Sequence, residues 1–210
     1  MTGWVRPALT LVAVAGMSSA AGLVMSQGRP AETRPRMAIA APVALPVNGG
    51  DRVVYPEGSR PVLAADGAPP IVVRSLLNVG HAMSHGDHVW NEEGAGHGPL
   101  RVRVDLARQT VSVFRGGDEI GTAVILYGAD DRPTPAGSFP ILARARSHRS
   151  SLYDAPMPYM LRLTGDGVAL HGSSVEKGYA THGCIGLPEG FARRLFDAAR
   201  VGDLVTVVRT

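Results

Sequence analysis

The residue of this chain best suited to chemistry is its single cysteine, Cys184, which lies in the sequence ATHGCIGLP at residues 180–188. A lone cysteine is buried and inert, paired with another chain, or a reactive thiol. Two histidines are placed to act on it: His182, two positions earlier, and His171, directly after the apolar residues 168–170. Because an imidazole can take up the proton of a thiol, this pattern indicates a cysteine nucleophile.

Glycines flank both candidate reactive residues. Gly172 follows His171, and Gly183 precedes Cys184. Their small size leaves room for a substrate carbonyl, and the N–H groups of Gly183 and Cys184 can meet a developing oxyanion. In an extended chain His182 faces the same side as Cys184, whereas His171 approaches from a neighbouring strand. The residues alone leave open which imidazole is the base.

A second histidine-rich pattern lies upstream. His81, His85 and His88 would share one face of a continuous helix, with His97 nearby, and zinc accepts imidazole ligands. Gly86 and the glycine-rich residues that follow it argue against a stable helix, and no carboxylate stands at the usual ligand spacing. We therefore predict a polar loop and no metal site.

The cysteine region resembles the catalytic signature of the L,D-transpeptidases (YkuD-type domains), a histidine and a spacer followed by Ser/Thr-His-Gly-Cys. Three further segments are similar to that family in the same order: the predicted hairpin at residues 104–114, the sequence TPAGSF at 134–139, and MPY at 157–159. The resemblance covers residues 100–209. It implies a mainly β fold, an L,D-transpeptidase-like β-sandwich or open barrel with one packed C-terminal helix.

The resemblance also implies catalytic roles. Cys184 would be the nucleophile, His171 the general base, and the carbonyl of Gly172 the group that orients that imidazole. His182 would position the thiol or polarise the oxyanion, next to the N–H group of Gly183.

For substrate binding the resemblance points to Tyr159, Thr181 and Gly186, with residues 147–153 bordering the donor site. Two features depart from the family. The spacer between His171 and Thr181 is shorter than usual, which trims a loop at the cleft. Gly186 stands where the family commonly has Arg or Asn, so one polar contact is missing.

The implied reaction is acyl transfer on peptidoglycan stem peptides. The thiolate attacks the carbonyl between meso-diaminopimelate and the terminal D-residue, and an amine then attacks the thioester. The acceptor is left open: a second stem gives a 3–3 crosslink, a protein lysine anchors a protein to the wall, and water gives a carboxypeptidase. No metal or organic cofactor is implied. The alternatives are an envelope cysteine hydrolase and a non-catalytic wall-binding module, for which Gly186 is the best argument.

The N-terminal part of the chain indicates export. Residues 9–25 form an uncharged apolar run after Arg6, so residues 1–26 are predicted to be a signal peptide or a membrane anchor, which the sequence does not distinguish. Residues 27–50 contain four prolines and are predicted to be an extended tether. These features place the rest of the protein in the periplasm or cell envelope. Nucleic-acid binding is not predicted, since the net charge is only +3 and 5% of residues are aromatic.

Alternating polarity predicts the elements that hold the site. In the predicted catalytic domain, residues 100–210, strands are expected at 102–106, 110–114, 119–126, 159–164, 167–170 and 203–209. Residues 188–200 have the apolar spacing of a helix. Residues 51–99 are less readable, with a strand expected near 52–55 and a short helix or strand at 71–79.

Overall fold

The computed structural model describes residues 47–49, 51–129 and 131–209. The chain divides into two compact units, residues 1–39 and 40–210, and the described residues all belong to the second. The predicted leader at 1–26 and most of the predicted tether lie outside them. Within the described ranges no helix has the length and hydrophobicity needed to cross a membrane.

The larger of the sheets has nine strands. Its central strand β7 alternates buried Val102 and Val104 with less buried Arg101 and Arg103, as the sequence pattern predicts. The order is β1 (Val47–Gly49), β2 (Arg52–Val54), β5 (Ser75–Leu77), β9 (Asp118–Val124), β8 (Thr110–Arg115), β7 (Leu100–Asp105), β15 (Leu204–Val208) and β10 (Gly137–Pro140), with β6 (His88–Trp90) also paired to β9.

The second sheet has four strands and carries the candidate site: β11 (Ala143–Ala145), β12 (Met160–Arg162), β13 (Ala169–Ser173) and β14 (Ile185–Pro188), in that order. Strands β13 and β14 run parallel, with His171 opposite Gly186. A separate two-stranded sheet is formed by β3 (Val62–Ala65) and β4 (Ala68–Val72). The predicted mainly β fold is confirmed.

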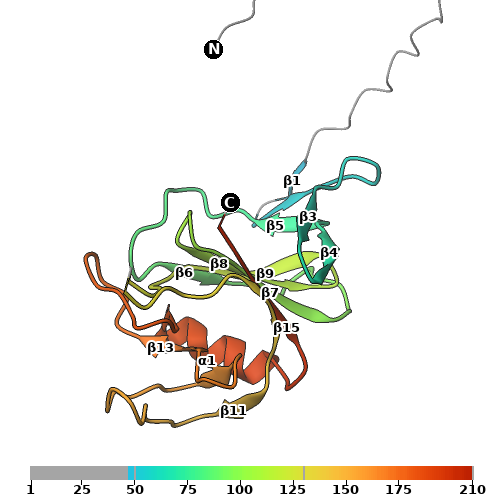
Figure 1. Cartoon of the computed structure of the whole chain (residues 1–210). Coiled ribbons are helices and arrows are strands. Elements are labelled where there is room, and N and C mark those ends of the chain that lie inside the picture. The colour runs from blue at the N-terminus through green and yellow to red at the C-terminus, as the bar shows by residue number, and fades with distance from the viewer. Residues whose placement is uncertain (1–46, 50, 130, 210) are drawn as a thin grey trace, which may run out of the picture. The chain divides into compact units, whose positions relative to one another are not determined.

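The helix α1 (Glu189–Ala198) follows β14 directly and lies between the nine-stranded sheet and the strand β11 (Figure 1). Phe191 and Leu195 on its buried face join a core to which both sheets contribute. The edge of the Trp90 ring meets the Phe191 ring, with 5.4 Å between centroids. Burying each such side chain contributes about 1.5–3 kcal/mol, so the helix fixes the strand that follows the cysteine.

Residues 51–99 are part of the same fold. Strands β2, β5 and β6 belong to the nine-stranded sheet, and β1 begins inside the segment predicted to be a tether. Buried Arg52 connects β2 to β9 and to the segment after β6. Its guanidinium donates hydrogen bonds to the carbonyls of Glu119 (2.6 Å), Asn91 (2.6 Å) and Glu93 (2.8 Å). These bonds satisfy a buried charge and attach the N-terminal strands to β9.

Two strand predictions need correction. The strand expected at 167–170 begins only at Ala169, because Gly167 has φ +105° and belongs to a turn. The strand expected at 119–126 is β9, which ends at Val124. Strand β14 was not predicted, because all four of its residues are buried and it shows no alternation.

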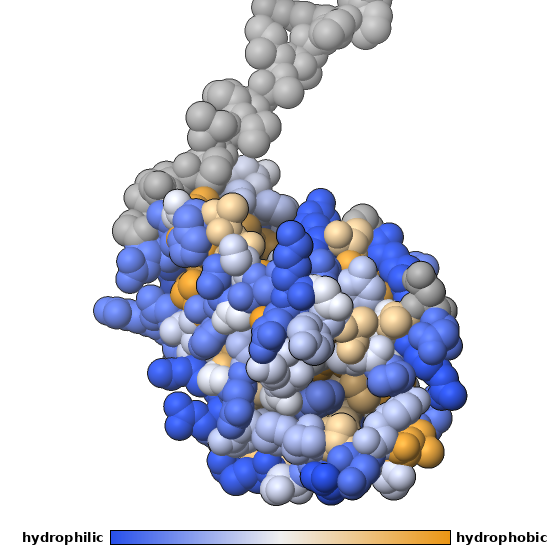
Figure 2. All heavy atoms as spheres, turned by 90° about the vertical axis from the view of Figure 1, so that its left-hand side faces the viewer, coloured by the Kyte–Doolittle hydropathy of each residue, from blue (hydrophilic) through white to orange (hydrophobic). Residues whose placement is uncertain are grey.

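Figure 2 shows one face of the domain, on which hydrophilic side chains predominate and apolar ones form small separate groups. Such a surface is typical of a domain in contact with water.

Candidate active site

Cys184 lies in a bend between β13 and β14, directly before Ile185, the first residue of β14. Its side chain is half-buried, and its Sγ lies 3.8 Å from the carbonyl oxygen of Gly167. The preceding Gly183 has φ +106°, a left-handed conformation that strains any residue with a side chain. The glycine in this motif therefore sets the direction in which the cysteine points.

The cysteine segment is held from both sides. On one side β14 pairs with β13. On the other, Gly186 and Leu126 exchange two backbone hydrogen bonds of 2.9 Å, and the N–H of Thr181 donates to the carbonyl of Tyr127 at 3.0 Å. The Thr181 hydroxyl donates to the carbonyl of Cys184, which closes the bend. Thr181 thus acts locally on the backbone of Cys184.

A buried threonine links a third segment to this bend. The Oγ1 of Thr134 donates to the carbonyl of Gly183 at 3.0 Å and accepts a hydrogen bond from the N–H of Gly128 at 2.8 Å. Thr134 belongs to the TPAGSF sequence. The resemblance drew attention to this segment, but only the fold brings its hydroxyl to the glycine before the cysteine.

His171 lies on β13 and is half-buried. Its Nδ1 lies 2.9 Å from the carbonyl oxygen of Gly172, which can only accept a hydrogen bond, so Nδ1 carries the proton and Nε2 is left as the basic nitrogen. The carbonyl of Gly172 thus lies where it can orient the imidazole, as the resemblance implies.

Burial acts on both reactive groups. It lowers the pKa of His171 below the ordinary imidazole value, and a backbone hydrogen bond to Gly172 offsets part of this effect. It also raises the pKa of the Cys184 thiol above its ordinary value, and the Asp166 carboxylate raises that pKa further. The resting pair at neutral pH is therefore a thiol and a neutral imidazole.

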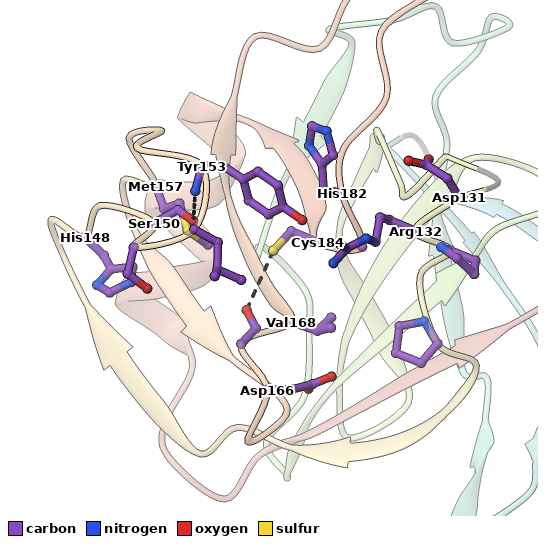
Figure 3. Close-up of a pocket in the computed structure, with 16 residues that line it drawn as sticks. Asp131, Arg132, His148, Ser150, Tyr153, Met157, Asp166, Val168, His182 and Cys184 are labelled. Atoms are coloured by element: carbon purple, nitrogen blue, oxygen red, sulfur yellow. Dashed lines mark hydrogen bonds between the residues drawn. The ribbon is translucent and has the colours of Figure 1, made fainter.

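Two pockets meet at Cys184. The smaller, about 180 Å³, is lined by both His171 and Cys184, together with Thr181 and His182. The larger, about 360 Å³, is lined by Cys184 and by charged side chains from two loops, among them Arg132 and Asp166 (Figure 3). Both volumes suit parts of a small ligand, and the sulfur is reachable from either side.

His182 is exposed, and its ring stacks on Tyr153 with 4.3 Å between centroids and 20° between planes. Figure 3 shows the two rings side by side, while the sulfur of Cys184 faces Gly167. Both rings line both pockets. His182 is thus placed as part of the pocket wall, and residues 150–153 border the larger pocket next to it.

Two predicted substrate-binding residues lie elsewhere. Among the residues described as lining the two pockets, neither Tyr159 nor Gly186 occurs. Tyr159 has φ +57° and packs its ring against Phe196, with 6.0 Å between centroids. Gly186 is buried in β14, where a Cβ atom would lie 3.2 Å from the Cβ of Ser173 and 3.3 Å from the Cβ of Leu126.

The upstream histidines do not gather. His88 lies on β6 with its ring 6.2 Å from that of Phe191, and His85 lines a shallow pocket with Met83 and Lys177. Within the described part of the chain no three His, Cys, Asp or Glu side chains come together as metal ligands.

Comparisons with known proteins agree with the geometry. Over 120 residues the chain is 33% identical to L,D-transpeptidase 1 of Mycobacterium tuberculosis, covering 49% of this chain and 48% of that protein, so it spans about half the length of this curated relative. An L,D-transpeptidase from Stackebrandtia nassauensis superposes with a TM-score of 0.50 and 25% identity, over 54% of this chain and 57% of that one.

An L,D-transpeptidase in complex with imipenem gives a TM-score of 0.48 and 31% identity, over 52% of this chain and 58% of that one. Residues 99–207 match the model of the L,D-transpeptidase catalytic domain, YkuD. This match spans just over half of the chain and contains Cys184, His171 and Thr134, so the chain belongs to the YkuD family of L,D-transpeptidase catalytic domains.

Proposed function

We propose that this protein catalyses cysteine-dependent acyl transfer on peptidoglycan stem peptides in the cell envelope. The observation that carries the proposal is that Cys184 and His171, from a bend and a neighbouring strand, line one pocket, while the same thiol also lines a second pocket. Two approaches to one nucleophile suit a reaction with a donor and an acceptor.

In the first step the thiol proton passes to Nε2 of His171 as the sulfur attacks the amide carbonyl between meso-diaminopimelate and the terminal D-residue. The N–H groups of Gly183 and Cys184 receive the developing oxyanion. When the C–N bond breaks, the imidazolium returns the proton to the departing amine, and the D-residue leaves with a neutral amino group. The stem remains bound to Cys184 as a thioester.

In the second step a neutral amine attacks the thioester carbonyl. A C–N bond forms and the C–S bond breaks, while His171 takes a proton from the amine and passes it to the sulfur. The acceptor amine belongs to a second stem, which gives a 3–3 crosslink, or to a protein lysine. With water in its place the enzyme is an L,D-carboxypeptidase. Thiol and imidazole supply all the proton transfers, and no step calls for a metal or an organic cofactor.

The competing reading as a wall-binding module was based on Gly186. This glycine lies in a packed position of β14 between Ser173 and Leu126, apart from both pockets. Its departure from the family pattern therefore removes no group from the pocket walls. This supports an enzyme over a binding module.

Export to the envelope is part of the proposal. It rests on the apolar run of residues 9–25 and on the peptidoglycan substrate implied by the family. Whether residues 1–26 are cleaved or hold the protein at the membrane is answered by N-terminal sequencing of the mature protein.

Acylation by imipenem, the ligand of one related structure, tests the proposal. Intact-mass spectrometry of the full chain is expected to show one imipenem adduct, which the variant Cys184→Ala lacks while its thermal unfolding stays close to that of the wild type. An adduct retained by Cys184→Ala would remove this residue as the nucleophile. An unmodified wild-type thiol would favour the binding module.

Mass spectrometry of products from purified muropeptides then identifies the acceptor. A crosslinked dimer with loss of the terminal D-residue supports transfer, and a shortened monomer alone, even with added amine, supports the hydrolase.

A further inference from the structure

The larger pocket carries charges of opposite sign on separate loops beside the thiol. Asp166 lies in the turn between β12 and β13, and Arg132 lies in the loop before Thr134. Both side chains are exposed and line the same pocket as Cys184 (Figure 3). The family signature contains neither residue, and the first step of the proposed reaction uses neither.

Asp166 is held in place by its own turn. The Thr164 hydroxyl donates to the Asp166 carboxylate and accepts a hydrogen bond from the N–H of Val168 at 3.0 Å. The next residue, Gly167, places its carbonyl oxygen 3.8 Å from the sulfur of Cys184. The turn that contacts the nucleophile therefore also positions the carboxylate.

Arg132 is positioned by packing against the opposite side of the cysteine bend. Its N–H donates to the carbonyl of Ala129 at 2.9 Å. A Cβ atom on Gly128 would lie 2.0 Å from the Arg132 carbonyl oxygen, so this close approach requires glycine there. Among the described residues its guanidinium makes no ion pair or hydrogen bond, and Figure 3 shows the side chain directed into the pocket.

The carboxylate of Asp166 opposes ionisation of the nucleophile, because its negative charge disfavours the thiolate. A carboxylate in this position hinders the chemistry of the free enzyme. It becomes favourable when a cationic group of the substrate lies next to it, since an ammonium group offsets the negative charge of the carboxylate.

We propose that Asp166 and Arg132 determine acceptor specificity in the larger pocket by binding the amino group and the carboxylate of an amino-acid-like acceptor. This inference rests on the proposed transferase function. Asp166 accepts hydrogen bonds from the amino group both as ammonium and as the neutral amine that attacks. Arg132 pairs with the carboxylate on the same carbon, for which a guanidinium is well suited. A lysine side chain offers an amine without that carboxylate and is the poorer acceptor.

The other charged or titratable groups facing this pocket are Asp131, His148 and His182. In Figure 3, Asp131 lies at the far side of Arg132 from the sulfur, and His148 lies to the left of Ser150, farther from the sulfur. Asp166 and Arg132 are the oppositely charged pair on the two loops that contact the cysteine bend.

The test separates acylation from acceptor choice. The full chain is first acylated with a tetrapeptide stem, and release of D-alanine is measured. Three amines, D-norleucine, D-norleucine amide and Nα-acetyl-lysine amide, then compete with water for the acyl-enzyme. The transfer product of each amine and the hydrolysis product are quantified by mass spectrometry. Wild type is expected to prefer D-norleucine over both amides by about tenfold, the size of one charge-assisted hydrogen bond.

Two variants probe the two contacts. Arg132→Gln is expected to lower transfer to D-norleucine about tenfold and transfer to its amide less than twofold. Asp166→Asn is expected to lower transfer to all three amines. The matched controls Asp66→Asn and Arg193→Gln change exposed residues outside both pockets and should match wild type.

Alkylation of Cys184 by a neutral reagent is expected to become faster in Asp166→Asn, whereas transfer to the amines becomes slower. Asp166→Asn should speed alkylation of Cys184 by iodoacetamide at neutral pH several-fold, because the thiol pKa falls. Slower alkylation, or acceptor preferences within twofold of wild type in both variants, would overturn this inference while leaving acylation intact. Absence of D-alanine release from the wild type would instead overturn the proposed function as well.

Discussion

The two pockets that share Cys184 differ in size and chemistry. The smaller contains His171 and is otherwise lined largely by small or apolar side chains, whereas the larger has charged walls from loops that face solvent. Desolvation lowers the pKa of the His171 imidazole and so keeps it neutral and able to accept a proton, while recognition of a charged substrate needs side chains that water can reach. In the proposed reaction this contrast would assign proton transfer and substrate selection to different pockets that share one sulfur.

The largest expected effect is on the acylation rate, and it should distinguish His171 from His182. His171→Ala should slow acylation by imipenem about 10²- to 10⁴-fold, because the variant lacks the base that takes the thiol proton. His182→Ala should cost far less, since its ring stacks on Tyr153 in the pocket wall. Stopped-flow acylation kinetics measure both, with His148→Ala as a control. A loss below threefold for His171→Ala would assign the base to His182.

A substitution at Thr134 tests whether acylation requires the hydrogen bond that holds the cysteine bend at Gly183. Thr134→Val keeps the shape of the side chain but removes the hydrogen bonds to Gly128 and Gly183, so stability should fall by about 1–3 kcal/mol and acylation about tenfold. Chemical denaturation and acylation kinetics report these separately. A stability loss with an unchanged acylation rate would mean that Thr134 supports the fold and leaves the nucleophile unaffected.

A substitution at Gly186 tests whether β14 has room for a side chain at this position. Gly186→Asn restores a residue type common in the family, yet its Cβ would crowd Ser173 and Leu126, so we expect a loss of about 1–3 kcal/mol from overpacking. Gly165→Asn is the control, because nothing lies within 4 Å of a Cβ there. Equal thermal unfolding of the two variants would show that β14 has room for a polar side chain.

The smallest effect is a change in the shape of the pH profile. The base is active when neutral, so acylation should rise with pH through a pKa below the ordinary imidazole value. Direct alkylation by iodoacetamide should rise only above the ordinary thiol pKa, because burial raises that of Cys184. Alkylation that is already at its maximum at pH 6 would indicate a preformed thiolate and contradict this order.

The candidate reactive residues could be proposed from the sequence because their pattern is local. Cys184, Gly183 and His182 are adjacent, and His171 ends an apolar run, so spacing alone indicated the chemistry. The role of Thr134 was not predictable, since its bond to Gly183 spans 49 positions of the chain. The position of Tyr159 outside both pockets also depended on the fold, because its backbone has a positive φ and its ring packs on Phe196.

The fold was predictable where one face of a strand meets the core. Strand β7 alternates, and its prediction from polarity was close to the observed bounds. Strand β14 is buried throughout and α1 covers it, so its sequence has no period. Among residues 51–99, the short strands β2, β5 and β6 have partners that lie far along the chain, which leaves little local pattern.

The attachment through Arg52 has a consequence for how the protein can be shortened. Strand β9 pairs with β8 on one side and with β5 and β6 on the other, and residues 99–207 alone do not include β5 or β6. A fragment cut to that range would expose the free N–H and C=O groups of β9, the kind of open border along which chains aggregate. We therefore expect a fragment that folds by itself to be longer than residues 99–207 and to begin before Arg52.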